Sequence, residues 1–226
     1  MPKTRPACIY CGSTERPSRD HVPPKTLFLR PRPSNLITVP SCEPCNSGFA
    51  LDDEYMRTVL ITRAETADHP ATTALIDEVS RSLARPKARG LANLVAESFT
   101  ELDIHTPSGL FLETQPAFSA DAARLLRNIE RIGRGLYFHE AGQRLPANIR
   151  VEADMLLESG TECSKGVGRY LAGRPVDRFG RNEFQYCWLA ASDNPSATIC
   201  RMVFFGVSHF VCVTAPERPG ISAEAV

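Results

Sequence analysis

The segment that decides the fold runs from residue 8 to residue 46 and reads CIYCGSTERPSRDHVPPKTLFLRPRPSNLITVPSCEPCN. It contains two Cys-x-x-Cys pairs, Cys8/Cys11 and Cys42/Cys45, which 30 residues separate. Two residues between cysteines let both thiolates face one point, and two such pairs complete a tetrahedral zinc site. We therefore predict that Cys8, Cys11, Cys42 and Cys45 bind one structural Zn²⁺.

Polar residues between and just after these pairs add a second pattern. Asp20-His21 and Asn35 lie between the pairs, and Asn46 directly follows Cys45. The order Cys-x-x-Cys, Asp-His, Asn-Leu, Cys-x-x-Cys-Asn resembles the HNH endonucleases that have a zinc-stapled treble-clef (ββα-metal) core. The resemblance covers about residues 8–60. It implies that His21 is the general base, that Asp20 and Asn46 hold one divalent ion, and that Asn35 braces the loop.

The chemistry of phosphodiester cleavage suits these residue types. An imidazole with a pKa near 6.5 can take a proton from water at neutral pH. Mg²⁺ or Mn²⁺ held by the oxygens of Asp20 and Asn46 would neutralise charge on the phosphate. Adjacent strand residues point to opposite faces, so Asp20 and His21 need a bend or bulge to reach one phosphate. The resemblance thus predicts a metal-dependent endonuclease, with DNA as the favoured substrate.

The segment also departs from the commonest form of the family. Asn46 stands where many members have His, and Phe49 replaces a frequent Lys. Asn is a weaker ligand than His for transition metals but is acceptable for Mg²⁺. Asp53 or Glu54, further along the expected helix, is a candidate additional ligand.

Simpler interpretations of the same residues stay open. Asp20 and His21 can be a hydrogen-bonded pair that stiffens the loop, Asn35 a turn residue and Asn46 a helix cap. The alternative function is then a non-catalytic zinc module that binds nucleic acid or protein.

The charge of the chain is informative only in its distribution. The 226 residues carry 26 basic and 26 acidic side chains, so net charge gives no support for nucleic-acid binding. Residues 1–35, however, carry seven Lys or Arg against two acids, which fits a surface facing phosphates. Arginines also recur at helical spacing on one stripe, a candidate phosphate track, although a solvated face is the simpler interpretation: Arg124, Arg127, Arg131 and Arg134.

The remaining sequence predicts an α+β protein. Apolar periodicity indicates helices over about 47–68, 71–85 and 119–132, the last one capped by Ser119 and ended by Gly133 and Gly135. A short strand is expected at 109–113, and an antiparallel meander from strands at 149–157, 183–191, 197–205 and 209–214. We expect a zinc-bound treble-clef domain (1–65), an α+β region of unknown role with an antiparallel sheet (66–215), and a flexible tail (216–226).

The N-terminus does not resemble a secretory signal, and no apolar run approaches the roughly 20 residues that span a bilayer. These features predict a cytoplasmic protein with no membrane partner. The expected partner is nucleic acid, with a protein partner or homo-oligomer formed through the C-terminal region as a further possibility.

Overall fold

The structure is a computed structural model that describes residues 6–156 and 162–216. Helices and antiparallel strands alternate along the chain, which confirms the predicted α+β class. Of the predicted tail over 216–226, Pro216 ends the last strand, and the rest lies outside the described residues. None of the described helices is long and apolar enough to cross a membrane.

The cysteine segment folds as a hairpin followed by helices. Strands β1 (Pro17–Val22) and β2 (Ile37–Cys42) pair antiparallel, and α1 (Glu43–Gly48) and α2 (Ala50–Ile61) follow directly. The short 3-10 helix η1 (Lys25–Leu27) lies in the connection between the strands. The helix expected to reach residue 68 ends at Ile61, and threonine hydroxyls bind carbonyls of its last turn. Thr62 donates to the carbonyl of Thr58 (2.9 Å), and Thr66 donates to that of Ile61 (3.1 Å).

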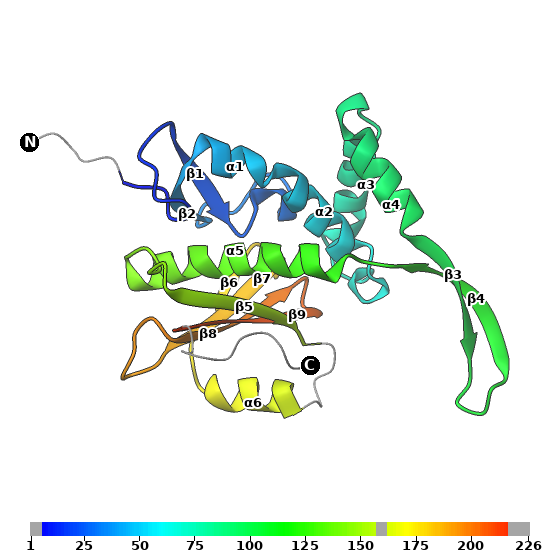
Figure 1. Cartoon of the computed structure of the whole chain (residues 1–226). Coiled ribbons are helices and arrows are strands. Elements are labelled where there is room, and N and C mark those ends of the chain that lie inside the picture. The colour runs from blue at the N-terminus through cyan, green and yellow to red at the C-terminus, as the bar shows by residue number, and fades with distance from the viewer. Residues whose placement is uncertain (1–5, 157–161, 217–226) are drawn as a thin grey trace, which may run out of the picture.

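Helix α5 (Ala122–Ala141) forms the middle layer of the molecule. Figure 1 shows it between the β1–β2 segment on one side and the C-terminal sheet on the other. The helix begins at an Asp121 cap, whose Oδ1 accepts from the Arg124 N–H (2.9 Å), and not at Ser119 as predicted.

The predicted end of this helix at residue 132 is also wrong. Gly133 and Gly135 are interior residues that permit close packing on both sides. A Cβ at Gly133 would meet the sulfur of Cys212, and one at Gly135 would lie 2.5 Å from Val22 Cγ2. The helix ends instead at Gly142, whose positive φ (+68°) suits a C-terminal cap.

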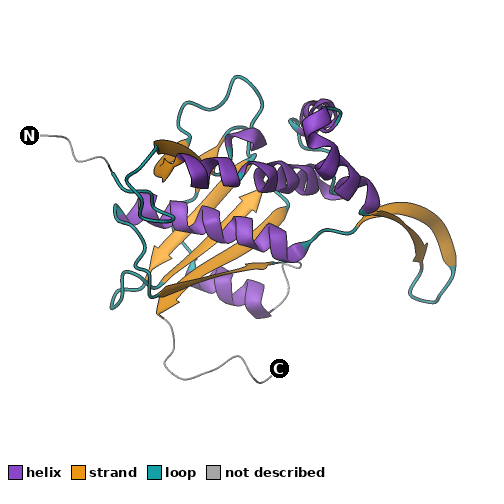
Figure 2. Cartoon of the chain, turned by 45° about the horizontal axis from the view of Figure 1, so that its top comes forward, coloured by secondary structure: helices purple, strands orange, loops and turns teal. Residues whose placement is uncertain are grey.

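The C-terminal sheet has the strand order β5-β9-β8-β7-β6, with every pair antiparallel. All four strands predicted in this region are present, and the meander runs from β6 to β9. The sequence did not predict α6 (Glu162–Tyr170), which lies on the sheet face opposite α5 (Figure 2). The strands are β5 (Ile149–Met155), β6 (Asp177–Phe179), β7 (Phe184–Ala190), β8 (Thr198–Phe204) and β9 (Ser208–Pro216).

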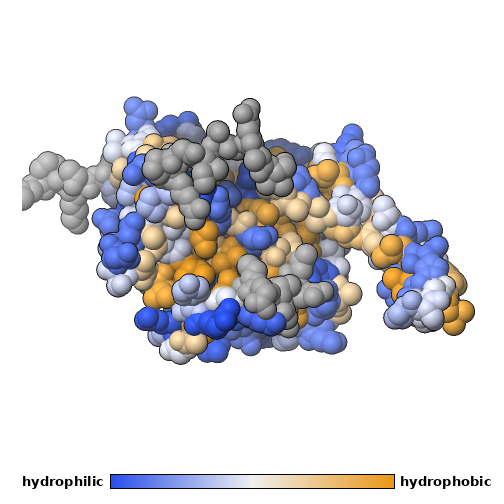
Figure 3. All heavy atoms as spheres, turned by 60° about the horizontal axis from the view of Figure 1, so that its bottom comes forward, coloured by the Kyte–Doolittle hydropathy of each residue, from blue (hydrophilic) through white to orange (hydrophobic). Residues whose placement is uncertain are grey.

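An arm extends from the other end of the molecule. Helices α3 (Thr72–Leu83) and α4 (Arg89–Glu97) lead into the hairpin of β3 (Phe99–His105) and β4 (Phe111–Phe118). Figure 3 shows the arm projecting from the body with apolar and polar atoms side by side on its surface. The expected strand at 109–113 is thus replaced by a longer hairpin, and α4 was not expected.

One main core connects the two ends of the chain. Val22 and Val39 of the hairpin, Tyr55 of α2 and Ile129 of α5 are buried in the same apolar cluster as Phe210 of β9. The β1–β2 segment therefore packs against α5 through apolar contacts.

Candidate metal centre and the neighbouring histidine

The four predicted zinc ligands converge. Cys8 and Cys11 lie in the loop before β1, Cys42 ends β2, and Cys45 lies in α1. Their sulfur atoms all lie within 4.8 Å of one another, and those of Cys11 and Cys42 are 3.6 Å apart. Zn–S distances of about 2.3 Å in a tetrahedron place sulfurs about 3.8 Å apart, so the group fits zinc. Elsewhere in the described residues, no other group of three or more His, Cys, Asp or Glu side chains gathers this closely.

Backbone hydrogen bonds shape the loop that carries the first two cysteines. The Gly12 N–H donates to the Cys8 carbonyl (2.9 Å), and the Cys8 N–H donates to the Ser13 carbonyl (2.8 Å). Gly12 has a φ of +82°, which glycine adopts at low cost. The Glu43 N–H donates to the Arg16 carbonyl (2.8 Å), so the start of α1 is tied to the start of β1.

The thiols of this group do not ionise equally. Burial opposes ionisation of Cys8, but backbone hydrogen bonds from Cys11, Tyr10 and Cys42 outweigh it and lower the pKa of Cys8 to about 6. The pKa of Cys45 is raised, first by burial and then by its hydrogen bonds with Cys42 and Cys11. Crowded sulfurs resist a second negative charge, and a divalent cation relieves that repulsion.

His21 lies on β1, half-buried, directly across from Thr38 of β2. The two strands pair from Pro17 to Val22 without a register shift, so the bend or bulge expected near His21 is absent from this hairpin. Asp20 and His21 therefore point to opposite faces, with Asp20 turned into the interior.

The surroundings of His21 are basic. Burial lowers the pKa of His21, Lys25 lowers it further, and Arg32 and Arg19 add to the effect against the opposing charge of Asp20. The Nε of Arg32 donates to the Lys25 carbonyl (2.9 Å), which keeps these two cations together. A neutral imidazole can accept a proton, and nearby cations attract phosphate, so this environment suits a base acting on a phosphodiester.

Asp20 is held in a buried polar network. Its Oδ2 accepts from the Tyr10 hydroxyl (2.7 Å) and from Nη1 of Arg131 (2.9 Å), and Asp20 is only 4% exposed. The Arg131 guanidinium also pairs with Asp53 and lies 4.5 Å from the centre of the Phe49 ring. The charge of Asp20, which the sequence assigned to a divalent ion, is thus balanced by a guanidinium.

The two candidate additional ligands also face arginines. Burial raises the pKa of Asp53 to about 6, although Arg131 lowers it, and the nearby Asp20 raises it further. Glu54 pairs with Arg57 at 3.2 Å. Both carboxylates are therefore engaged in ion pairs within the structure.

The two predicted asparagines occupy different environments. Asn46 uses its Nδ2 to donate to Ser18 Oγ (2.8 Å) and to the Arg19 carbonyl (3.2 Å), which ties α1 to β1 two residues before His21. Asn35 is exposed in the turn before β2, and its side chain has no hydrogen-bond partner among the described residues. Its environment is that of a turn residue.

The arginine stripe on α5 is interrupted. Arg131 is 6% exposed and lies in the ion pairs described above, because its face of α5 packs against the β1–β2 segment. Arg124 pairs with Asp52 (2.6 Å) and stacks on Tyr55. Arg127 and Arg134 remain at the surface and, with Arg144, line a groove beside Tyr10 and Phe49. A continuous track of four solvent-facing guanidinium groups is therefore absent from this fully described helix.

The sequence interpretation missed two parts of the site. The Asp20–Arg131 pair joins residues 111 positions apart, and no local pattern marks it. Lys25 and Arg32 had a signal, because both belong to the basic run over residues 1–35.

Comparison with known proteins adds no assignment, since no family model, curated protein or solved structure matches the chain.

Proposed function

We propose that the protein is a metal-dependent endonuclease of the HNH type that hydrolyses phosphodiester bonds of nucleic acid, with DNA as the favoured substrate. The observation that carries the proposal is the position of His21. It lies half-buried on a hairpin stapled by a zinc-competent cysteine group, with Lys25, Arg32 and Arg19 around it.

In the proposed reaction a water molecule gives a proton to His21 while the water oxygen attacks phosphorus. The new P–O bond forms while the bond to the leaving sugar oxygen breaks, and that oxygen takes a proton from solvent. The cations around His21 attract the non-bridging oxygens as negative charge grows on them. Asn46 keeps α1 against β1 and so fixes the strand that carries His21.

The catalytic Mg²⁺ or Mn²⁺ belongs to the same proposal. Oδ1 of Asp20 and Oδ1 of Asn46 have no hydrogen-bond partner among the described residues, so these two oxygens would be the ligands of the ion. Oxygen donors suit Mg²⁺, which commonly takes one or two carboxylates and completes its shell with water and phosphate. Because β1 has no bulge and Asp20 points to the face opposite His21, Asp20 would have to turn away from Arg131 to place the ion at the phosphate that His21 acts on. An ion held there would neutralise charge on the phosphate and on the leaving oxygen.

A non-catalytic zinc module that binds nucleic acid or protein is the second candidate. The Asp20–Arg131 pair favours it, because a carboxylate that already balances a buried guanidinium is less available to a divalent ion. On this hypothesis, His21→Ala, which keeps the Asp20–Arg131 pair, leaves nucleic-acid binding unchanged.

The deciding experiment compares cleavage of plasmid DNA, single-stranded DNA and RNA by wild type, His21→Ala and His139→Ala, with Mg²⁺ or Mn²⁺. His139 is an exposed histidine on α5 and serves as the matched control. Cleavage by wild type and His139→Ala but not by His21→Ala supports the proposal, provided that all three proteins hold zinc and are folded. Equal cleavage by all three, or by none on any substrate with either metal, would refute it.

The remaining proposals concern cellular context. Seven cysteines of the described residues form no disulfide, and cysteine pairs that bind metal instead of forming disulfides are typical of the cytoplasm. We therefore propose a cytoplasmic location. A protein partner or a second copy of the chain, bound through the C-terminal region, is part of the same proposal.

A further inference from the structure

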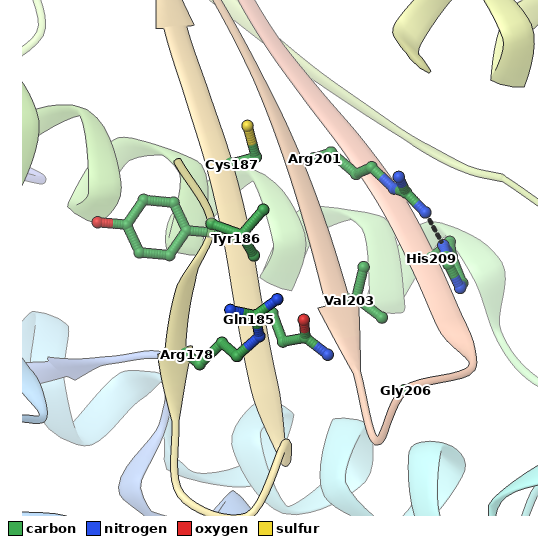
Figure 4. A pocket seen from close by; sticks show the side chains of 9 residues that line it. Arg178, Gln185, Tyr186, Cys187, Arg201, Val203, Gly206 and His209 are labelled. Carbon is green, nitrogen blue, oxygen red and sulfur yellow. Dashed lines mark hydrogen bonds between the residues drawn. The ribbon is translucent and has the colours of Figure 1, made fainter. Parts of the chain in front are cut away.

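A separate pocket lies on the sheet face opposite α5, and the nuclease proposal does not use it. The cavity of about 200 Å³ is formed by residues of β6, β7, β8 and β9 and by the chain just before β6. Figure 4 shows Gln185, Arg201 and His209 on the near side of the sheet with α5 behind it. The lining includes Arg178, Gln185, Cys187, Arg201, Val203 and His209.

The basic side chains of this pocket form no ion pair with an acid of the described residues, although Asp177 lies next to Arg178 and adds to burial in raising the pKa of Cys187. Nη2 of Arg201 donates to Nδ1 of His209 (2.8 Å), and the Nε of Arg201 is buried without a hydrogen-bond partner. Across the described part of the chain, no carboxylate forms an ion pair with Arg201 or Arg178. A partly buried guanidinium without a counter-charge is costly, so an anionic ligand would stabilise this arrangement.

The Arg201–His209 bond also determines what His209 can offer. An imidazole nitrogen that accepts from a guanidinium carries no proton, so the proton of His209 is assigned to Nε2. Burial lowers the pKa of His209 and Arg201 lowers it further, against a hydrogen bond to the Gly206 backbone that raises it, and the net direction keeps the ring neutral. The ring N–H of His209 donates to the backbone of Gly206, so His209 orients the Arg201 guanidinium and offers no free donor of its own.

The two arginines flank the pocket from different strands. Arg178 of β6 pairs in register with Gln185 of β7, and Arg201 lies on β8, beyond β7. Arg201 is in register with Cys187 and extends towards His209 on β9, whereas Arg178 lies beside Gln185 (Figure 4). A ligand held at Arg201 would therefore be reached by Arg178 only if its long side chain extends across β7, over strands about 4.8 Å apart. Val176 and Val203 supply apolar walls.

We propose that this pocket binds the phosphate monoester group of a small molecule or of a nucleic-acid end. Two guanidinium groups match a group that carries about −1.5 to −2 charge at neutral pH better than they match a single carboxylate. Arg201 and Arg178 hold the phosphate oxygens, Gln185 adds a neutral donor, and His209 orients the Arg201 guanidinium. The inference does not depend on the proposed nuclease activity.

The test is a calorimetric titration of the full chain with four probes of defined chemistry. They are inorganic phosphate, a nucleoside 5′-monophosphate, an oligonucleotide with a 5′-phosphate, and butyrate. We expect saturable binding of at least one phosphate probe and weaker binding of butyrate. If the monophosphate binds more tightly than the oligonucleotide, the ligand is a free metabolite, and the reverse order indicates a nucleic-acid end.

The variants make the assignment specific. Arg201→Gln removes a charge-assisted donor and should weaken phosphate binding at least about tenfold. Arg150→Gln, which removes one exposed charge from β5 of the same sheet, should leave the affinity within about twofold. If Arg201→Gln does not fold, Arg178→Gln takes its place. Absence of saturable phosphate binding, equal losses in the Arg201→Gln and Arg150→Gln variants, or butyrate binding as tight as phosphate would overturn the inference.

Discussion

Replacing Arg131 by Met tests whether the buried ion pairs hold the β1–β2 segment on α5. The side chains of Arg131 and Asp20 are 6% and 5% exposed, and that of Asp53 is 17% exposed. Removing one partner of a buried pair leaves a charge without compensation and costs about 3–5 kcal/mol. We expect a loss of that size in denaturant unfolding of the zinc-loaded protein near pH 7.5. Arg127→Met, one turn earlier on the same helix and exposed, should change stability by less than about 0.5 kcal/mol.

The pH dependence makes the same experiment sharper. The folded pKa of Asp53, about 6, exceeds its ordinary value of 3.8, a difference that corresponds to about 3 kcal/mol. The contribution of Asp53 to stability is therefore complete below about pH 3.8 and is lost as pH rises through about 6. Without Arg131, the unpaired carboxylates of Asp20 and Asp53 are less costly to bury once they are protonated. The loss of unfolding free energy caused by Arg131→Met should therefore become smaller towards pH 5. Adding Asp20→Asn and Asp53→Asn should restore much of the loss at neutral pH. A cost below about 1 kcal/mol near pH 7.5, or a cost that grows on acidification, would refute the reasoning.

Three further predictions concern the metal, the histidine and the packing of α5. Metal analysis should find one zinc per chain, and Cys42→Ser should lose both the zinc and the ordered N-terminal segment; full zinc content in that variant would contradict the ligand set. If the protein cleaves nucleic acid, its rate should rise with pH to a plateau with a midpoint below about 6.5, because only neutral His21 accepts a proton. Arg32→Gln should move that midpoint upward, because Arg32 lowers the pKa of His21. An unchanged midpoint would show that Arg32 does not affect the titration of His21. Gly135→Ala places a methyl group against Val22 and should destabilise by about 1–3 kcal/mol in thermal or denaturant unfolding, whereas Gly90→Ala on α4 meets open space and should not destabilise. Equal effects of the two glycine variants would contradict the close approach.

Local patterns predicted the parts of the fold that local chemistry determines. The cysteine spacing identified the four residues whose sulfurs converge, because two residues between cysteines restrict where the thiols can point. Apolar alternation located β5, β7, β8 and β9, because the alternation of side chains between the two faces of a strand is also a local property.

The errors arise where distant packing decides. Gly133 and Gly135 looked like helix terminators, yet both lie inside the helix. Cys212 and Val22, which are distant in sequence, pack so closely against them that a Cβ would clash. Arg131 was assigned to a surface stripe, because its helical spacing matches that of Arg127 and Arg134. Only the tertiary structure shows that its face of α5 meets Asp20.

Helix α5 makes the zinc segment and the C-terminal sheet depend on each other. Its Gly135 lies against Val22 of β1, and its Arg131 pairs with Asp20, the neighbour of His21. Further on, Arg144 donates to the carbonyl of Ile9 (3.1 Å), within the first cysteine pair. A fragment ending near residue 65 would therefore expose Val22 to water and leave Asp20 without its cation. The backbone position of His21 is set by zinc on one side and by α5 on the other, so substitutions in α5 can change the chemistry of His21 without touching it.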